Sequence, residues 1–171
     1  MEGRYDIVII GAGPAGMEAA ITAKIRNKRI LLVGSGGGST KVQKAHEIQN
    51  YLGLPAVSGE EMQGRFMEHL AQMGIPITAG KVAAAYPMGE YFSLPLDADI
   101  IESRSLILAC GVNFGTPFPG EAEFLGRGVS YCATCDAALY RGKSAIVVAY
   151  SPEEEKEAAF LAEKAAKVTY L

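Results

Sequence analysis

The first 35 residues alternate between short apolar runs and an alanine-rich stretch. Tyr5–Ile10 has the composition of a strand, Met17–Arg26 is rich in alanine and helix-forming residues, and Arg29–Val33 is a second apolar run. A strand, a helix and a strand in this order predict a parallel βαβ unit. This part of the chain is therefore predicted to be α/β.

The middle of the chain has a more varied pattern. After a predicted loop at His46–Pro55, Glu60–Met73 has helical periodicity and Ile75–Gly80 has the composition of a third parallel strand. Lys81–Ser105 breaks into short strand-like pieces punctuated by Pro and Gly, which predicts a small antiparallel insertion. Leu106–Gly111 is a short apolar run that ends in Gly, and we expect it to be a buried strand beside the first one.

The turn that follows the first strand has the sequence Gly11-Ala12-Gly13-Pro14-Ala15-Gly16. In a dinucleotide site the three glycines allow a tight turn, close approach of a pyrophosphate and close helix–strand packing, and the helix start holds the anion. The spacing alone is a weak signal, because such glycines can simply shape a turn, but its place between strand and helix predicts dinucleotide binding. The acidic residue that usually binds the ribose after the second strand is absent, and Gly34 stands there.

The strongest chemical signal is the sequence Cys132-Ala133-Thr134-Cys135-Asp136. Two thiols at this spacing can form a small-ring disulfide, a helix start favours the thiolate, and Asp136 can exchange a proton with it. The alternatives are half of a zinc site and two inert thiols. His46 and His69 supply no ligand pair with suitable spacing, so we predict no metal site. The third cysteine, Cys110, is expected to be buried in the sheet.

Composition and charge exclude several classes of protein. The chain has 171 residues with 16 basic and 19 acidic side chains, a formal net charge of −3 and 49% hydrophobic residues. This balance predicts a globular protein that binds no nucleic acid. Three Cys are too few for a disulfide scaffold, and no apolar run reaches the roughly 20 residues that cross a membrane. We therefore expect a cytoplasmic location.

The chain resembles the low-molecular-weight thioredoxin reductases, which are flavoproteins of the pyridine nucleotide-disulfide oxidoreductase class. The resemblance extends over essentially the whole length. It is carried by residues 11–16, Glu47–Tyr51, Leu106–Gly111, Pro119–Glu121 and, most specifically, Gly126–Asp136.

The resemblance implies an FAD cofactor, a redox-active disulfide between Cys132 and Cys135, and a thioredoxin-like partner. It further implies that Cys135 faces the flavin, that Cys132 attacks the partner's disulfide, that Asp136 is acid and base, and that the protein is a homodimer. The predicted cofactor-binding residues lie in the glycine-rich turn and at neighbouring strand ends: Gly11, Gly13, Pro14, Ala15, Gly16, Gly34, Cys110 and Gly111.

One departure from the family concerns the electron donor. In the family, a strand like Lys143–Val148 leads into a second glycine-rich turn that binds NADPH, whereas residues 149–155 here contain no Gly. Ser151, Pro152 and Glu154 predict a helix start capped by its own side chains, and the neighbouring carboxylates would repel a pyrophosphate. We therefore predict that NADPH does not bind here in the usual manner.

Another donor is then required. Some relatives are ferredoxin-linked flavin thioredoxin reductases, and a ferredoxin donor is our hypothesis. The candidate docking residues for an acidic ferredoxin are basic: Lys41, Lys44, Arg65, Arg127 and Arg141. An NADPH-dependent thioredoxin reductase with an atypical second site and a non-catalytic flavin-fold binding module are the alternatives.

The predicted fold is α/β with two parts. Residues 1–115 are expected to form the front part of a Rossmann-like three-layer FAD-binding domain with a small antiparallel insertion. Residues 116–171 are expected to begin a second α/β domain that carries the Cys pair, with a helix at Glu153–Lys167 and a strand that starts at Val168. Because this second domain stops after one βαβ unit, we expect the chain to be a fragment of a longer polypeptide.

Overall fold

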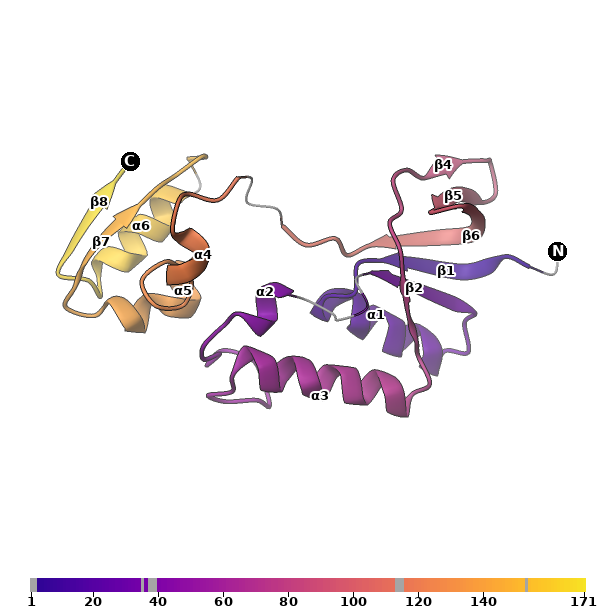
Figure 1. Cartoon of the computed structure of the whole chain (residues 1–171), viewed down its shortest axis with the longest axis horizontal. Coiled ribbons are helices and arrows are strands. Elements are labelled where there is room, and N and C mark those ends of the chain that lie inside the picture. The colour runs from indigo at the N-terminus through magenta and orange to yellow at the C-terminus, as the bar shows by residue number, and fades with distance from the viewer. Residues whose placement is uncertain (1–2, 35, 37–39, 113–115, 153) are drawn as a thin grey trace. The chain divides into compact units, whose positions relative to one another are not determined.

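The structure is a computed structural model that describes residues 3–34, 36, 40–112, 116–152 and 154–171 (Figure 1). The chain divides into two compact units. The first comprises Met1–Lys44 and Ser58–Gly115, and the second comprises Ala45–Val57 and Thr116–Leu171. The segment Ala45–Val57 thus belongs by its contacts to the second unit, although it lies between two parts of the first in the sequence.

The first unit contains a six-stranded mixed sheet with the order β3-β2-β1-β6-β5-β4. The strands are β1 (Tyr5–Ile10), β2 (Ile30–Gly34), β3 (Ile77–Ala79), β4 (Tyr86–Pro87), β5 (Phe92–Leu96) and β6 (Asp99–Leu108). The strands β3, β2, β1 and β6 are parallel, and β6, β5 and β4 are antiparallel. In the register, Ile9 lies between Leu32 and Ile107.

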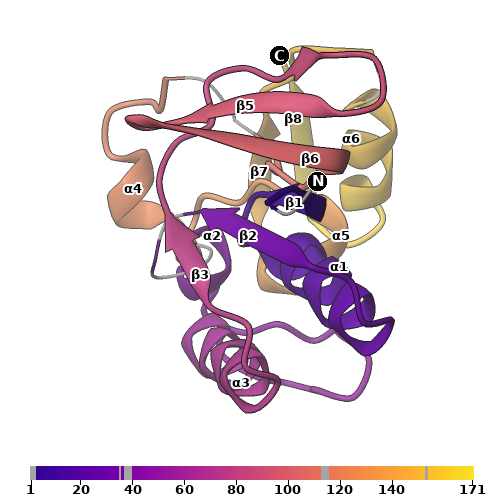
Figure 2. The same cartoon turned by 90° about the vertical axis from the view of Figure 1, so that its right-hand side faces the viewer.

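Three helices accompany this sheet: α1 (Pro14–Ile25), α2 (Thr40–Gln43) and α3 (Gly59–Gln72). Figure 2 shows α1 and α3 on one side of the parallel strands and β5 on the other. Side chains of a strand alternate between faces, so Ile9 packs in the cluster with helix residues such as Met17, whereas Val8 packs with Leu94 of β5. Helices, parallel sheet and antiparallel strands confirm the predicted three-layer α/β fold.

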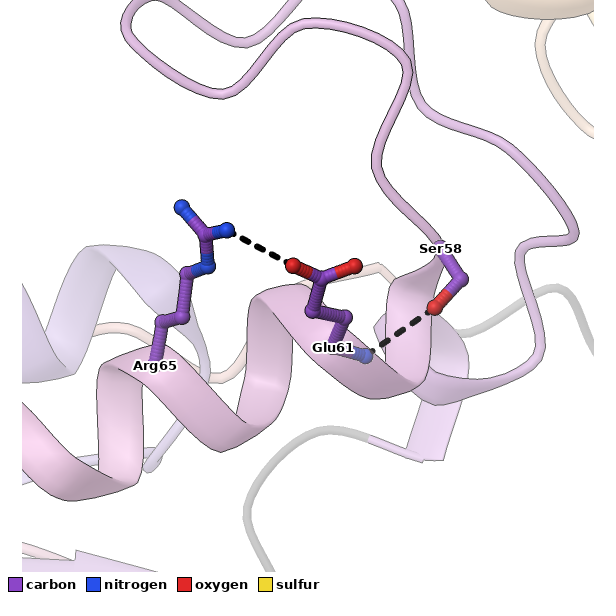
Figure 3. Close-up of polar contacts among 3 residues, drawn as sticks. All are labelled: Ser58, Glu61 and Arg65. Atoms are coloured by element: carbon purple, nitrogen blue, oxygen red, sulfur yellow. Dashed lines mark hydrogen bonds and ion pairs between the residues drawn. The ribbon is translucent and has the colours of Figure 1, made fainter.

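The start of α3 illustrates how local sequence fixes an element. Ser58 is the N-cap, and its Oγ accepts a hydrogen bond of 3.1 Å from the backbone N–H of Glu61 (Figure 3). The carboxylate of Glu61 lies 2.7 Å from the guanidinium of Arg65, one helical turn further on. The cap satisfies a donor that the helix leaves unpaired, so the helix begins directly after Ser58.

The prediction for the strand after the antiparallel insertion was partly wrong. β6 lies beside β1, as expected, but it begins at Asp99, well before Leu106, because its first half pairs with β5 and its second half with β1. Its end is not buried, since Leu108 is 72% exposed. In the described part of the chain, β5 pairs with β6 only as far as Ser103. The last residues of β6 therefore have β1 on one side and, among the described residues, no paired strand on the other.

The second unit contains one βαβ unit and several short helices. Its elements are α4 (Glu121–Phe124), α5 (Ala133–Asp136), the 3₁₀ helix η1 (Ala137–Tyr140), β7 (Ser144–Val147), α6 (Glu154–Ala162) and β8 (Lys167–Tyr170). β7 and β8 are parallel. The predicted helix at Glu153–Lys167 ends earlier, at Ala162, because the chain turns there and Ala165 bridges to Arg141. Glu153 lies outside the described residues.

The segment Ala45–Val57 is a loop, as predicted for His46–Pro55, and it is closed at its base. Ile48 and Val57 exchange two backbone hydrogen bonds, with N···O distances of 2.7 and 3.2 Å. At the far end of the loop, Leu52 is 98% exposed. Among the helices in the described ranges, none combines the length and apolar character needed to cross a membrane.

Candidate functional site

The glycine-rich turn after β1 is formed by close backbone contacts. Gly11 has a φ of +114°, and a Cβ placed on it would lie 2.1 Å from the carbonyl oxygen of Ala109. A Cβ on Gly16 would lie 1.8 Å from the carbonyl oxygen of Gly11. Neither position can carry a side chain without movement of the backbone. These two glycines therefore bring the start of α1 against the ends of β1 and β6.

Gly13, the middle glycine, has a different environment. A Cβ on Gly13 would have no atom of the described residues within 4 Å. Gly13 is also the N-cap of α1, where no side chain in the described part of the structure caps the first turn, and Pro14 occupies the start of the helix. The N–H groups of a first turn have no partner inside the helix. Open space and uncapped donors at one place suit a phosphate-bearing ligand.

Gly34 has a structural role that the sequence analysis missed. A Cβ at this position would lie 2.6 Å from the Cβ and 2.8 Å from the backbone nitrogen of Ala12. The end of β2 therefore passes so close to the glycine-rich turn that an acidic side chain cannot stand there. This steric contact explains why Gly replaces the ribose-binding carboxylate.

Cys110 does not occupy the buried position that we expected. It is a free and exposed cysteine just beyond the end of β6. Its thiol donates a hydrogen bond to the carbonyl oxygen of Ile10, with an S···O distance of 3.6 Å. The prediction of burial fails because β6 ends at Leu108 and the chain then leaves the sheet. Gly111 follows with a φ of +70°.

In the second unit, Cys132 and Cys135 form a disulfide, as the Cys spacing suggested. Cys132 is the N-cap of α5, and its Sγ accepts a hydrogen bond of 3.1 Å from the backbone N–H of Cys135. Cys132 is half-buried, whereas Cys135 is exposed. The sulfur atoms are bonded to each other, which favours a redox pair over a zinc site.

Asp136 is tied to the Cys pair through Ser130, a residue that the sequence analysis did not single out. The hydroxyl of Ser130 donates a hydrogen bond of 2.6 Å to Oδ2 of Asp136 and accepts one of 3.0 Å from the backbone N–H of Cys132. The N–H of Asp136 in turn bonds to the carbonyl of Cys132 at 3.1 Å. The position of Ser130, two residues before Cys132, could have indicated that its hydroxyl bonds to the nearby backbone.

Two further polar groups lie close to this motif. The hydroxyl of Tyr140 donates a hydrogen bond of 3.1 Å to the carbonyl of Gly128. Burial, and then the negative charge of Asp136, raise the pKa of Tyr140, so its phenol stays protonated. The side-chain amide of Asn50 donates to Sγ of Cys135 at 3.8 Å. Sequence patterns did not predict this contact, because 85 residues separate Asn50 from Cys135.

The turn between β7 and α6 is closed by a side chain. The carboxylate of Glu154 accepts hydrogen bonds from the backbone N–H of Ser151, at 2.9 Å, and from that of Tyr150. These hydrogen bonds, from Ser151 first and then from Tyr150, lower the pKa of Glu154 below its ordinary value. The predicted cap is thus formed by Glu154, which occupies donors that an anion would need.

The basic residues proposed for docking do not form one group on either unit. Lys44 and Arg65 belong to the first unit, and Arg127 and Arg141 belong to the second. The guanidinium of Arg65 pairs with Glu61, and that of Arg127 donates to the carbonyl of Glu123 at 3.2 Å. The side chain of Lys41 lies outside the described part of the structure.

Comparisons with known proteins agree with this arrangement. Residues 5–149 match a family described as pyridine nucleotide-disulphide oxidoreductase. The thioredoxin reductase of Bacillus subtilis (strain 168) is 34% identical over 166 residues, which are 96% of this chain and 52% of that protein. The chain spans about half the length of the curated relatives it matches.

Two solved structures are also similar. A ferredoxin-flavin thioredoxin reductase from Clostridium acetobutylicum is 52% identical, with a TM-score of 0.65, over 98% of this chain and 58% of that one. The thioredoxin reductase from Streptococcus pyogenes MGAS5005 is 32% identical, with a TM-score of 0.86, over 99% of this chain and 56% of that one.

Proposed function

The chain belongs to the pyridine nucleotide-disulphide oxidoreductase family, and from this premise we propose that it is a flavin-dependent disulfide reductase. Electrons pass through FAD to the Cys132–Cys135 disulfide and on to a disulfide of thioredoxin or a thioredoxin-like protein. The observation that carries the proposal is the disulfide itself, which is partly exposed and linked by Ser130 to the carboxylate of Asp136.

The family and its thioredoxin reductases are FAD-dependent, so FAD is the cofactor. The uncapped start of α1 and the open side of Gly13 fit its pyrophosphate. The residues proposed to hold it are those of the turn and the adjoining strand ends: Gly11, Gly13, Pro14, Ala15, Gly16, Gly34, Cys110 and Gly111. When bound, FAD supplies the two-electron reduction of the disulfide.

The thiols produced by that reduction have different roles in the proposal. Asp136 takes the proton of the Cys132 thiol, the Cys132 thiolate attacks the partner's disulfide and forms a mixed disulfide, and the partner sulfur that leaves takes this proton back from Asp136. The Cys135 thiolate then attacks Cys132 Sγ, which restores the intramolecular disulfide and releases the second partner thiolate. The N–H of Cys135, which points at Cys132 Sγ, stabilises negative charge on the attacking sulfur.

A reduced ferredoxin is the proposed electron donor. The backbone N–H groups of Tyr150 and Ser151 already donate to the carboxylate of Glu154. This supports the proposal that the turn between β7 and α6 does not bind the pyrophosphate of NADPH. The ferredoxin-flavin thioredoxin reductase from Clostridium acetobutylicum has 52% identity, against 34% for the Bacillus subtilis thioredoxin reductase. This difference also favours ferredoxin as the donor.

The test is a stopped-flow measurement of flavin absorbance in the full-length polypeptide. We expect reduced ferredoxin to bleach the flavin bands within seconds and NADPH to leave them unchanged. Cys135→Ser should retain flavin bleaching and lose thioredoxin reduction. Bleaching by NADPH at micromolar concentration would contradict the donor, and a protein that binds no flavin would instead support a non-catalytic binding module.

Three further features remain predictions from the resemblance. They are a homodimeric assembly, a cytoplasmic location, and the division of function between an FAD-binding part at residues 1–115 and a disulfide-bearing part at residues 116–171. Size-exclusion chromatography with light scattering tests the dimer.

A further inference from the structure

Among the described residues of the second unit, each sulfur of the disulfide accepts one hydrogen bond, and the two donors are of different kinds. Sγ of Cys132 accepts from the backbone N–H of Cys135 at 3.1 Å, a donor built into the short helix α5. Sγ of Cys135 accepts from Nδ2 of Asn50 at 3.8 Å, a donor brought from the loop Ala45–Val57. A substitution at Asn50 can therefore alter the surroundings of one sulfur and leave the donor of the other in place.

The loop that carries Asn50 is held by its own backbone. Ile48 and Val57 close its base with two hydrogen bonds, and the N–H of Leu54 bonds to the carbonyl of Tyr51 at 3.0 Å. The neighbouring side chain of Gln49 donates to Glu47 within the same loop. Asn50 and Gln49 are thus adjacent amides on one loop, and in the described structure Asn50 donates to a sulfur whereas Gln49 donates to a carboxylate.

We propose that Asn50 is a positioning residue that directs negative charge to Cys135 when the disulfide is reduced. The S–S bond breaks as two electrons enter it and leaves a thiolate on each sulfur, each in equilibrium with solvent protons; the amide N–H of Asn50 donates to Cys135 and favours its thiolate form. An N–H donor stabilises a thiolate more than a neutral thiol, because the hydrogen bond to the charged form is stronger.

This inference rests on the proposed function, because in that function the Cys135 thiolate attacks Cys132 Sγ and releases the partner. It goes beyond that function by naming a residue far from the Cys motif in the sequence that separates the behaviour of the two thiols. The amide acts on Cys135 and need not contact flavin or partner.

The test measures alkylation of each thiol in the full-length protein after reduction with excess dithiothreitol, which supplies both electrons and is itself oxidised to its cyclic disulfide. After removal of the reductant, iodoacetamide labelling is followed across a pH series by peptide mass spectrometry, which separates Cys132 from Cys135. The variants are Asn50→Ala, Asn50→Asp and, as the matched control, Gln49→Ala. Neither ferredoxin nor thioredoxin is needed, so the result is independent of turnover.

We expect Asn50→Ala to slow alkylation of Cys135 about threefold to tenfold near neutral pH, with the rate at Cys132 unchanged, because fewer Cys135 groups are thiolates. Asn50→Asp, which keeps the shape but replaces the donor by a carboxylate, should slow Cys135 further, and Gln49→Ala should match the parent. Unchanged Cys135 alkylation in Asn50→Asp, or an equal change at both thiols, would overturn the proposal. If alkylation follows the expectation but thioredoxin is not reduced, the proposed function fails and this inference stands.

Discussion

The turn between β1 and α1 and the turn between β7 and α6 both join a parallel strand to a helix, but the two helix starts are satisfied differently. At the first, Gly13 is an N-cap with no side-chain hydrogen bond and with open space beside it. At the second, the carboxylate of Glu154 accepts from the backbone N–H of Ser151. A bound anion needs free N–H groups at a helix start, so the βαβ scaffold alone does not define a phosphate site. The side chains that follow the strand decide whether one exists.

We expect the largest effect when one methyl group is added to the turn between β1 and α1. Gly16→Ala places a Cβ 1.8 Å from the carbonyl oxygen of Gly11, and backbone must move to relieve the contact. We expect a loss of about 2–4 kcal/mol in the free energy of unfolding, together with loss of bound flavin. Urea unfolding followed by circular dichroism measures the first effect, and flavin content measures the second. Wild-type stability in this variant would mean that the turn is looser than the structure indicates.

Gly13→Ala separates cofactor binding from stability in the same turn, because a methyl group there meets no atom of the described residues within 4 Å. The fold should persist, with a loss of about 0.5–1 kcal/mol because Ala is a poorer N-cap than Gly. FAD binding should weaken about tenfold to a hundredfold, since the methyl group occupies the space through which a pyrophosphate reaches the backbone. Titration of the flavin-free protein with FAD gives the affinity. Unaltered affinity would remove Gly13 from the proposed cofactor site.

Ser58→Ala tests what a side-chain cap contributes in this protein. The hydroxyl of Ser58 bonds to the N–H of Glu61 at the start of α3, and its loss should lower the free energy of unfolding by about 1 kcal/mol. Arg65→Ala is the matched control on the same helix. Its ion pair with Glu61 is exposed, and its loss should cost about 0.3 kcal/mol. Equal losses in the two variants would contradict the assignment of the cap.

Glu154→Gln should give the smallest effect, visible in its pH dependence. Hydrogen bonds from Ser151 and Tyr150 lower the pKa of Glu154 below its ordinary value of 4.5. The unfolded state therefore binds the proton more readily, so the stabilisation by this carboxylate is full above pH 4.5 and disappears as the pH falls through the lowered pKa. Glu154→Gln removes this titration. The unfolding temperatures of parent and variant, measured between about pH 3 and pH 6, should converge at the acid end. A difference that stays constant across this range would exclude stabilisation by the Glu154 carboxylate.

Local patterns predicted most of the fold and the pairing of the two cysteines. The apolar run at β1, the glycine-rich turn and the Cys spacing each involve neighbours in the sequence, and the structure forms a strand, a turn and a disulfide from them. The role of Glu154 was also predictable, because a cap acts within one helical turn.

Features that depend on distant parts of the chain were not predictable in this way. Gly34 is required by the approach of Ala12, which belongs to another element. The exposure of Cys110 depends on where β6 leaves the sheet, and the contact of Asn50 with Cys135 joins residues 85 positions apart. Periodicity describes which face of an element is apolar, but it does not identify which distant element comes to meet it.

The place of Ala45–Val57 in the second unit has a topological consequence. The chain passes between the two units at residues 44 and 45, again at 57 and 58, and finally at 115 and 116. The second unit is therefore discontinuous, and a shorter polypeptide made from residue 116 onward would lack the loop that reaches its disulfide. During synthesis, the loop Ala45–Val57 leaves the ribosome before residues 116–171, with which it packs, have been made. A single proteolytic cut at one of the three crossings would still leave the units joined by the other two.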